Sequence, residues 1–278
     1  MSPRRLLLFD EDPAVLERVA GWLQRDDRRI QGVGNAREAL NHLRDAAYDV
    51  VVAGPWRNGC DGVKLLRRMR SVRPDAKVIL TGDRNPARAV AALRAHAYSY
   101  LHQPPAPGPL AEIVQYALDS SSWRDDLQVI SARPEWVTVD VRCKLEAAER
   151  ATHLLRESAV ELSAAACEDV TAAFHELLMN AIEHGCGLNP RKHVRISLLR
   201  TPRALMVHIQ DSGRGFSLAR LPHAAVNNPE DSPIRHVEIR AEQGQRPGGF
   251  GILMASKLVD DLVYNERGNE VFFVKNIA

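Results

Sequence analysis

Residues 174–185 read Phe174-His-Glu-Leu-Leu-Met-Asn-Ala-Ile-Glu-His-Gly185. The pattern predicts a helix, and at about 100° per residue Glu176, Asn180 and Glu183 share one of its faces. A carboxylate and a carboxamide one turn apart suit a general base and an oxygen-preferring Mg²⁺. A solvated polar face would explain the same side chains without a ligand. This segment alone therefore leaves both interpretations open.

A second segment joins an aspartate to two glycines. Val207-His-Ile-Gln-Asp-Ser-Gly-Arg-Gly-Phe216 predicts a strand that delivers Asp211 to a turn containing Gly213 and Gly215. An aspartate at a strand end can accept a hydrogen bond from an exocyclic amine, and glycines let the backbone approach a flat ring closely. An ordinary Asp-x-Gly turn is the alternative.

A third segment, Pro247-Gly-Gly-Phe-Gly-Ile-Leu253, places Gly249 and Gly251 immediately before a predicted helix. Backbone amides at a helix start, together with the helix dipole, form an anion site. A glycine-rich loop is weak evidence by itself. The order and spacing of the three segments together are much more specific.

The three segments together resemble the GHKL, or Bergerat-type, ATPases, with 174–185 as the N box and the other two as glycine boxes. Residues 136–278 resemble in particular the anti-sigma-factor serine kinases, through Asn180-Ala-Ile-Glu-His-Gly185 and Leu258-Val-Asp-Asp-Leu-Val-Tyr-Asn-Glu-Arg-Gly-Asn-Glu270. The resemblance implies a C-terminal Bergerat-type α/β sandwich that binds ATP and Mg²⁺.

The same resemblance implies roles for individual residues. Glu176 would be the base that deprotonates the acceptor hydroxyl, Asn180 would bind the Mg²⁺ that bridges the phosphates, and Asp211 would hold the adenine amino group. The pocket would be shaped by Gly213, Gly215, Gly249 and Gly251, with residues 218–248 as the ATP lid. Phosphoryl transfer needs mainly positioning and charge stabilisation, so this set is chemically sufficient.

The first half of the chain has a different pattern. From residue 4 to about 118, β-like runs at 5–9, 29–33, 49–53, 77–81 and 99–101 alternate with amphipathic stretches at 13–24, 36–46, 62–72, 86–95 and 110–118. This alternation predicts a doubly wound parallel sheet of five strands with helices on both faces. Ligands of such sheets bind at the carboxyl ends of the strands.

Residues 1–121 resemble a response-regulator receiver domain, which implies a flavodoxin-like fold. Phe9-Asp-Glu-Asp-Pro13 matches the acidic pocket after the first strand, with Asp10 and Glu11 as its carboxylates. Thr81 matches the hydroxyl of the fourth strand, Tyr100 matches the aromatic switch position, and Asp61-Gly62 fits the turn after the third strand.

The phosphoacceptor of a receiver is missing. Asp49-Val-Val-Val-Ala-Gly54 ends the third strand with Gly54 where an aspartate is expected. Asp49 cannot replace it, because five strand residues span about 16 Å. Gln103 stands where a basic residue is expected, which removes the ammonium that would pair with an acyl phosphate.

The acidic residues of this pocket have two interpretations. Asp10 and Glu11 could still bind Mg²⁺, or the segment could be structural, with Asp12 capping the helix that begins at Pro13. A metal site has little purpose without a phosphoacceptor, which favours the structural interpretation. We therefore expect a pseudo-receiver that docks a partner or dimerises, with an input other than aspartyl phosphate.

Composition narrows the setting. The 37 basic and 35 acidic residues give a net charge of +2 without a polybasic run, so no nucleic-acid partner and no membrane association are expected. The apolar run after Arg5 is shorter than the roughly 7–15 residues of a signal peptide, and no run approaches the roughly 18 residues of a membrane span. A cytoplasmic protein is expected, with residues 122–135 as the linker between its domains.

The expected function follows from the two resemblances. They imply a serine kinase that phosphorylates a STAS-type anti-sigma antagonist in a partner-switching circuit, under control of the pseudo-receiver, and that forms a homodimer. One alternative is a module without kinase activity that binds ATP and sequesters a sigma factor or another regulator. Another is a histidine-kinase-related signalling ATPase, although residues 120–162 contain only His153 and leave no room for a dimerising helical hairpin.

Overall fold

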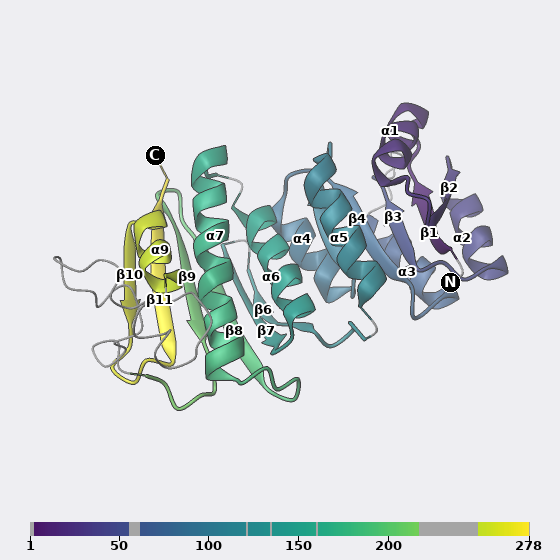
Figure 1. Cartoon of the computed structure of the whole chain (residues 1–278). Coiled ribbons are helices and arrows are strands. Elements are labelled where there is room, and N and C mark those ends of the chain that lie inside the picture. The colour runs from purple at the N-terminus through teal and green to yellow at the C-terminus, as the bar shows by residue number, and fades with distance from the viewer. Residues whose placement is uncertain are drawn as a thin grey trace. The chain divides into compact units, whose positions relative to one another are not determined.

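The computed structural model describes residues 3–55, 62–120, 122–133, 135–159, 161–216 and 250–277. The chain divides into two compact units, Met1–Gln128 and Val129–Ala278 (Figure 1). Among the described helices, none combines the length and the apolar character that crossing a membrane requires.

The first unit is a parallel sheet with the strand order β2-β1-β3-β4-β5. Every strand and helix that the alternation predicts is present, with small shifts at the ends. The elements are β1 (Arg4–Phe9), α1 (Pro13–Leu23), β2 (Arg28–Val33), α2 (Ala36–Asp45), β3 (Val50–Ala53), α3 (Gly62–Val72), β4 (Lys77–Gly82), α4 (Pro86–Arg94), β5 (Ser99–His102) and α5 (Pro107–Asp119).

Two apolar cores lie on opposite faces of this sheet. Along β1, Leu7 and Phe9 join a core with α2, α3 and α4, whereas Leu6 and Leu8 join a core with α1 and α5. All four side chains are at most 2% exposed. A parallel strand covered on both faces is expected to be apolar throughout, which explains the unbroken Leu-Leu-Leu-Phe run.

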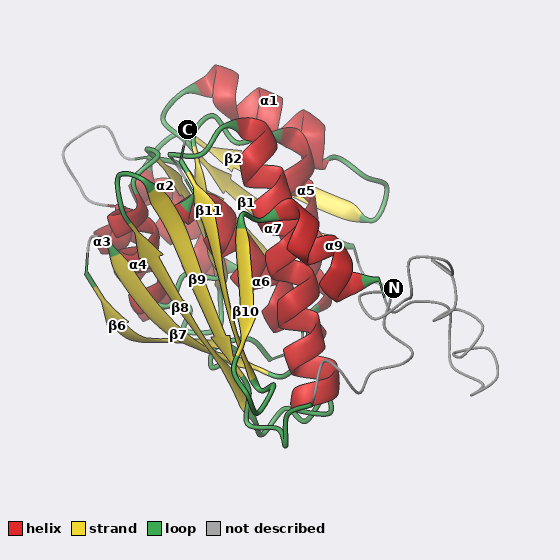
Figure 2. Ribbon diagram, turned by 90° about the vertical axis from the view of Figure 1, so that its left-hand side faces the viewer, coloured by secondary structure: helices red, strands yellow, loops and turns green. Residues whose placement is uncertain are grey.

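The second unit is an antiparallel sheet of the order β10-β11-β9-β8-β7-β6, with helices α6, α7 and α9 on one face. Figure 2 shows α7 and α9 side by side on that face. The elements are β6 (Leu127–Ala132), β7 (Trp136–Arg142), α6 (Leu145–Ser158), α7 (Ala164–Asn180), the π-helix η1 (Ala181–Gly185), β8 (His193–Arg200), β9 (Ala204–Gln210), α9 (Gly251–Leu258), β10 (Asp261–Tyr264) and β11 (Glu270–Asn276).

The segment 122–135, expected as a linker, is more ordered than that prediction implies. Trp123 is 5% exposed and packs edge-on against Tyr98 in the first core, with ring centroids 5.6 Å apart. Strand β6 then joins the second sheet at its edge. The 218–248 lid expected from the resemblance lies outside the described residues.

Candidate functional site

Two residues of the first motif, Glu176 and Asn180, lie half-buried at the C-terminal end of α7, where α9 packs against it. Glycine at position 251 makes this approach possible. A Cβ atom there would lie 2.6 Å from Oε2 of Glu176 and 3.7 Å from Nδ2 of Asn180. Gly251 is the first residue of α9, so both polar side chains face a helix N-terminus, where backbone amides favour anions. Gly249 lies outside the described residues.

The helix expected to continue through residue 184 changes character at Ala181. The backbone N–H of Cys186 donates to the carbonyl of Ala181 at 2.9 Å, the five-residue spacing of a π-helix. Glu183, expected on the same face as Glu176, is exposed to solvent. The prediction of three polar residues on one face assumed a regular α-helical period, and the π turn ends that period.

Asp211 lies directly after β9 and packs against the end of this π turn. Its Oδ1 accepts the backbone N–H of Gly213 at 2.6 Å. A Cβ atom at Gly185 would lie 2.6 Å from Oδ2 of Asp211, and one at Gly213 would lie 2.5 Å from the Gly185 carbonyl oxygen. The two glycines therefore leave the space that the Asp211 carboxylate occupies.

Burial controls the acidity of Asp211. Loss of hydration raises the pKa of its carboxyl group, while the Gly213 hydrogen bond and the positive charges of Lys192 and Arg267 oppose that rise. Burial also raises the pKa of the Tyr264 hydroxyl, and the negative charge of Asp211 adds to that effect. Asp211 is thus a half-buried hydrogen-bond acceptor.

These side chains fit the chemistry of a nucleotide with its metal ion. The carboxamide of Asn180 offers an oxygen ligand of the kind that Mg²⁺ uses alongside phosphates. The first turn of α9 suits phosphate, and a carboxylate such as Asp211 can accept a hydrogen bond from an amine. Across the described ranges, no three or more His, Cys, Asp or Glu side chains form a metal-binding group.

In the first unit, the pocket at the carboxyl end of the sheet is filled by its own side chains. Nε2 of Gln103 donates to Oδ2 of Asp10 and to Oγ1 of Thr81, at 3.0 Å in each case. The buried Gly54 lies beside them, and a Cβ atom there would lie 2.7 Å from Cγ of Asp10. The cavity that remains is ≈ 10 Å³, room for about one water molecule.

The neighbouring residues have structural roles. Asp12 caps α1 by accepting the N–H of Ala14 at 3.0 Å, with Pro13 in the first turn, which confirms the predicted cap. Asp49 accepts the N–H of Arg5 at 2.7 Å at the opposite end of the sheet, so it cannot reach the pocket.

Tyr100 is buried and donates its hydroxyl to the carbonyl of Asp83 at 2.6 Å. Glu11 is half-exposed, and Asp61 lies outside the described residues.

Comparison with known families agrees with both halves of this geometry. Residues 6–115 match the family model of the response regulator receiver domain, and residues 139–275 match that of the histidine kinase-like ATPase domain.

The chain is a receiver domain joined to a histidine kinase-like ATPase domain.

Individual relatives match shorter parts of the chain. The transcriptional regulator NtrC of Azospirillum brasilense is 27% identical over 123 residues, which are 44% of this chain and 26% of NtrC. The response regulator MprA of Mycolicibacterium vanbaalenii is 31% identical over 103 residues, 37% of this chain and 45% of MprA. This chain thus spans less than half the length of either regulator.

Among solved structures, a CheY-like receiver domain protein from Methanospirillum hungatei is 25% identical, with a TM-score of 0.40, covering 42% of this chain and 95% of that one.

The two family models thus account for both halves of the chain, and an ATPase domain of this type implies ATP binding. Sequence reasoning overlooked the residues that support its pocket. The turn Arg267-Gly-Asn269 was quoted only within the 258–270 stretch that carries the resemblance and was given no part in the site, yet it contacts Asp211 and the first glycine box. Asn269 ends that turn and Asn265 lies four residues before it, and this spacing of two asparagines was the available signal.

Proposed function

We propose that this protein is an ATP-dependent serine kinase of the anti-sigma-factor type. Its substrate is a serine of a STAS-domain protein that antagonises an anti-sigma factor. A sigma factor is a further binding partner. The receiver domain regulates the kinase through protein contacts and not through aspartyl phosphate. The working unit is a homodimer.

The observation that carries this proposal is the contact of Glu176 with the start of α9. A Cβ atom at residue 251 would lie 2.6 Å from Oε2 of Glu176, so any other residue there would displace the carboxylate. A carboxylate that faces a phosphate-binding helix start can accept the proton of a hydroxyl attacking there. Asn180, one turn further along α7, adds a ligand for Mg²⁺, which when bound neutralises charge on the phosphates.

Asp211 supplies the other end of the nucleotide site. Its carboxylate is oriented by the N–H of Gly213 and is suited to accept a hydrogen bond from the amino group of adenine. Glu176 and Asn180 would then lie beside the phosphates of the nucleotide, and Asp211 would bind its adenine. Each of the three side chains contacts or adjoins a glycine that makes room for it.

The receiver domain supports regulation by contact. Gln103 is bound to both Asp10 and Thr81, and the remaining cavity of ≈ 10 Å³ has room for about one water molecule. An input through a protein partner or a second copy of the chain needs no free pocket. Serine on a separate protein is the proposed acceptor, because residues 120–162 offer only His153 for autophosphorylation.

The test is phosphoryl transfer from γ-labelled ATP to a co-purified STAS-domain protein. Glu176→Gln keeps the shape of the side chain and removes the base, so transfer should fall at least a hundredfold, a typical contribution of general-base catalysis, while ATP still binds. Glu183→Gln is the matched control: its carboxylate is exposed on the next helical turn, so transfer should stay at the wild-type level.

The outcomes separate this proposal from its two alternatives. Wild-type protein that binds ATP but transfers nothing, with signalling unchanged by Glu176→Gln in cells, would identify a sequestration module. Label that survives base and is lost in acid would be phosphohistidine and would identify a relative of the histidine kinases. Acid-stable phosphoserine on the STAS protein supports the proposal.

A further inference from the structure

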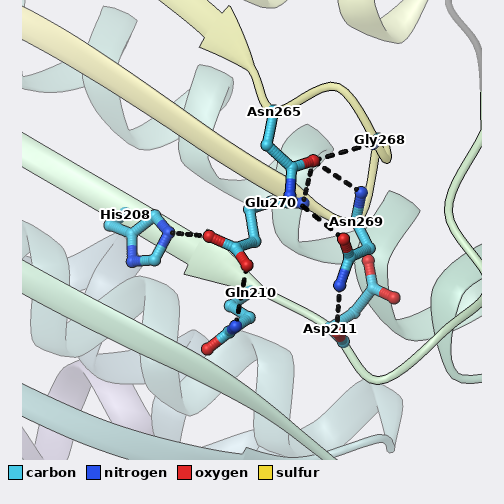
Figure 3. A network of polar contacts seen from close by, with 7 residues as sticks. All are labelled: His208, Gln210, Asp211, Asn265, Gly268, Asn269 and Glu270. Atoms are coloured by element: carbon cyan, nitrogen blue, oxygen red, sulfur yellow. Dashed lines mark hydrogen bonds and ion pairs between the residues drawn. The ribbon is translucent and has the colours of Figure 1, made fainter.

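The hairpin between β10 and β11 holds the residue that follows β9. The regular pairing of β11 with β9 ends at the pair Glu270 and Gln210, one position before Asp211. The N–H of Asp211 still donates to the carbonyl of Asn269, at 3.0 Å. The carbonyl of Asp211 instead accepts the side-chain amide Nδ2 of Asn269, at 3.1 Å (Figure 3). One residue thus holds both polar groups of the Asp211 backbone.

A second asparagine sets the orientation of that amide. Oδ1 of Asn265 accepts the backbone N–H groups of Gly268 at 2.7 Å and of Asn269 at 3.1 Å. Its Nδ2 must therefore point the other way, and it donates to Oδ1 of Asn269 at 3.1 Å. With its oxygen engaged, Asn269 turns its NH₂ group towards Asp211. Figure 3 shows this relay from Asn265 through Asn269 to Asp211.

The same turn also contacts the first glycine box. Nη2 of Arg267 donates to the carbonyl of Gly213 at 3.2 Å. Gly215 has a positive φ of 76°, and a Cβ atom there would lie 2.8 Å from the carbonyl carbon of Arg267. The turn and the glycine box are therefore packed backbone against backbone, which leaves Asp211 little freedom to reorient.

We infer that Asn269, oriented by Asn265, is a positioning residue that aims the Asp211 carboxylate at the adenine amino group and so sets the preference for adenine. The inference rests on the proposed function, which assigns Asp211 to the base. Asn269 is buried, with 8% of the residue exposed, and its side-chain amide makes the hydrogen bond that a regular strand pair would have supplied. Without that bond, only the backbone N–H of Asp211 would be held by the hairpin.

The experiment compares the affinities of the full-length protein for ATP and for inosine triphosphate, whose base carries a carbonyl oxygen in place of the amino group. Asn269→Asp is nearly isosteric and turns the donor that faces the Asp211 carbonyl into an acceptor. Loss of one buried hydrogen bond should weaken ATP binding about fivefold to tenfold. Affinity for inosine triphosphate should change much less, so the preference for ATP falls by nearly the same factor.

Two further variants sharpen the result. Asn265→Asp keeps the acceptor for the turn and removes the donor that orients Asn269, so it should reduce the preference for ATP in the same direction by a smaller factor. Asn276→Asp makes the same change at the exposed end of β11 and should leave both affinities unchanged. Thermal unfolding of each variant checks that it is folded.

Equal weakening of both nucleotides by Asn269→Asp would mean a merely structural role and would overturn the inference. An unchanged preference for ATP would overturn it as well. If the wild-type protein binds ATP but shows no preference over inosine triphosphate, the assignment of Asp211 to adenine fails, and this inference with it. Transfer activity is not needed for any of these readings, so failure of the kinase proposal is a separate result.

Discussion

The carboxyl group of Asp10 occupies the space beside Gly54. A Cβ atom at residue 54 would lie 2.7 Å from Cγ of Asp10, and Gln103 holds the carboxylate in place with a bond of 3.0 Å. By the resemblance to receiver domains, residue 54 is the position of the phosphoacceptor. The Asp10 side chain therefore occupies space that an aspartate at residue 54 would need. The following predictions test this pocket and the ATP site.

Acetyl phosphate should not label the receiver domain. The pocket lacks a carboxylate at residue 54, and Gln103 occupies it by donating to both Asp10 and Thr81. Intact-mass measurement after incubation with acetyl phosphate and Mg²⁺ checks this. Stoichiometric labelling that disappears in Asp10→Ala would contradict the prediction, because it would mean that Asp10 has taken over as the acceptor.

Restoring an aspartate at residue 54 should destabilise the domain. Gly54→Asp would place a second carboxylate against that of Asp10 in a buried pocket, and we expect a loss of about 2 kcal/mol in the free energy of unfolding. The loss should shrink when Gln103→Lys is added, because an ammonium group would lie between the two carboxylates. Urea unfolding measures both.

The control for that pair is Gly34→Asp, since a Cβ atom at Gly34 meets nothing within 4 Å. It should change the unfolding free energy by less than about 1 kcal/mol. A Gly54→Asp variant as stable as the control would mean that Asp10 leaves the pocket at little cost.

Gly251→Ala should impair transfer without impairing stability. The added methyl group would lie 2.6 Å from Oε2 of Glu176, and the flexible end of that side chain can move away. Alanine at the start of α9 is a better helix former than glycine. We expect kcat to fall about tenfold or more, since small displacements of a reacting group are costly, with an unchanged or higher melting temperature. The control is Gly108→Ala in α5, where an added Cβ meets nothing within 4 Å, and it should change neither kcat nor the melting temperature. A normal kcat for Gly251→Ala would argue against Glu176 as the base.

The pair His175 and Glu149 should make stability depend on pH. Nε2 of His175 lies 3.2 Å from Oε1 of Glu149, and this bond raises the pKa of the imidazole, with smaller contributions from the charges of Glu176 and Glu183. A raised histidine pKa contributes stability that is fully present below about 6.5, its unfolded value, and that is lost as pH rises through the folded value.

Glu149→Gln should therefore destabilise the protein more at acidic than at alkaline pH. Both side chains are about one-third exposed, so the difference should be small, about 0.5 kcal/mol. Unfolding free energies at about pH 5.5 and about pH 8.5 give the comparison. Glu146→Gln on the same helix should show no such dependence, and an equal cost of Glu149→Gln at both pH values would mean that the pair is uncharged in the folded state.

Local patterns were sufficient for most of the fold. The alternation of apolar runs with amphipathic stretches predicted the five-stranded sheet, because strand and helix periods are properties of neighbouring residues. Strand β6 was missed for the same reason: it lies at a sheet edge, and Ile130 within it is 46% exposed, so it has no alternating apolar face. The π turn after Asn180 also has no local signature in the sequence.

Motif order alone named the candidate residues Glu176, Asn180, Asp211 and Gly251, and it also showed that Gly54 and Gln103 replace two receiver residues. Which side chains meet was decided by packing between distant segments. Gln103 binds Asp10 across 93 positions, and Asn269 binds Asp211 across 58. Such contacts depend on where whole strands and helices lie, and residue spacing along the chain carries no information about that distance in space.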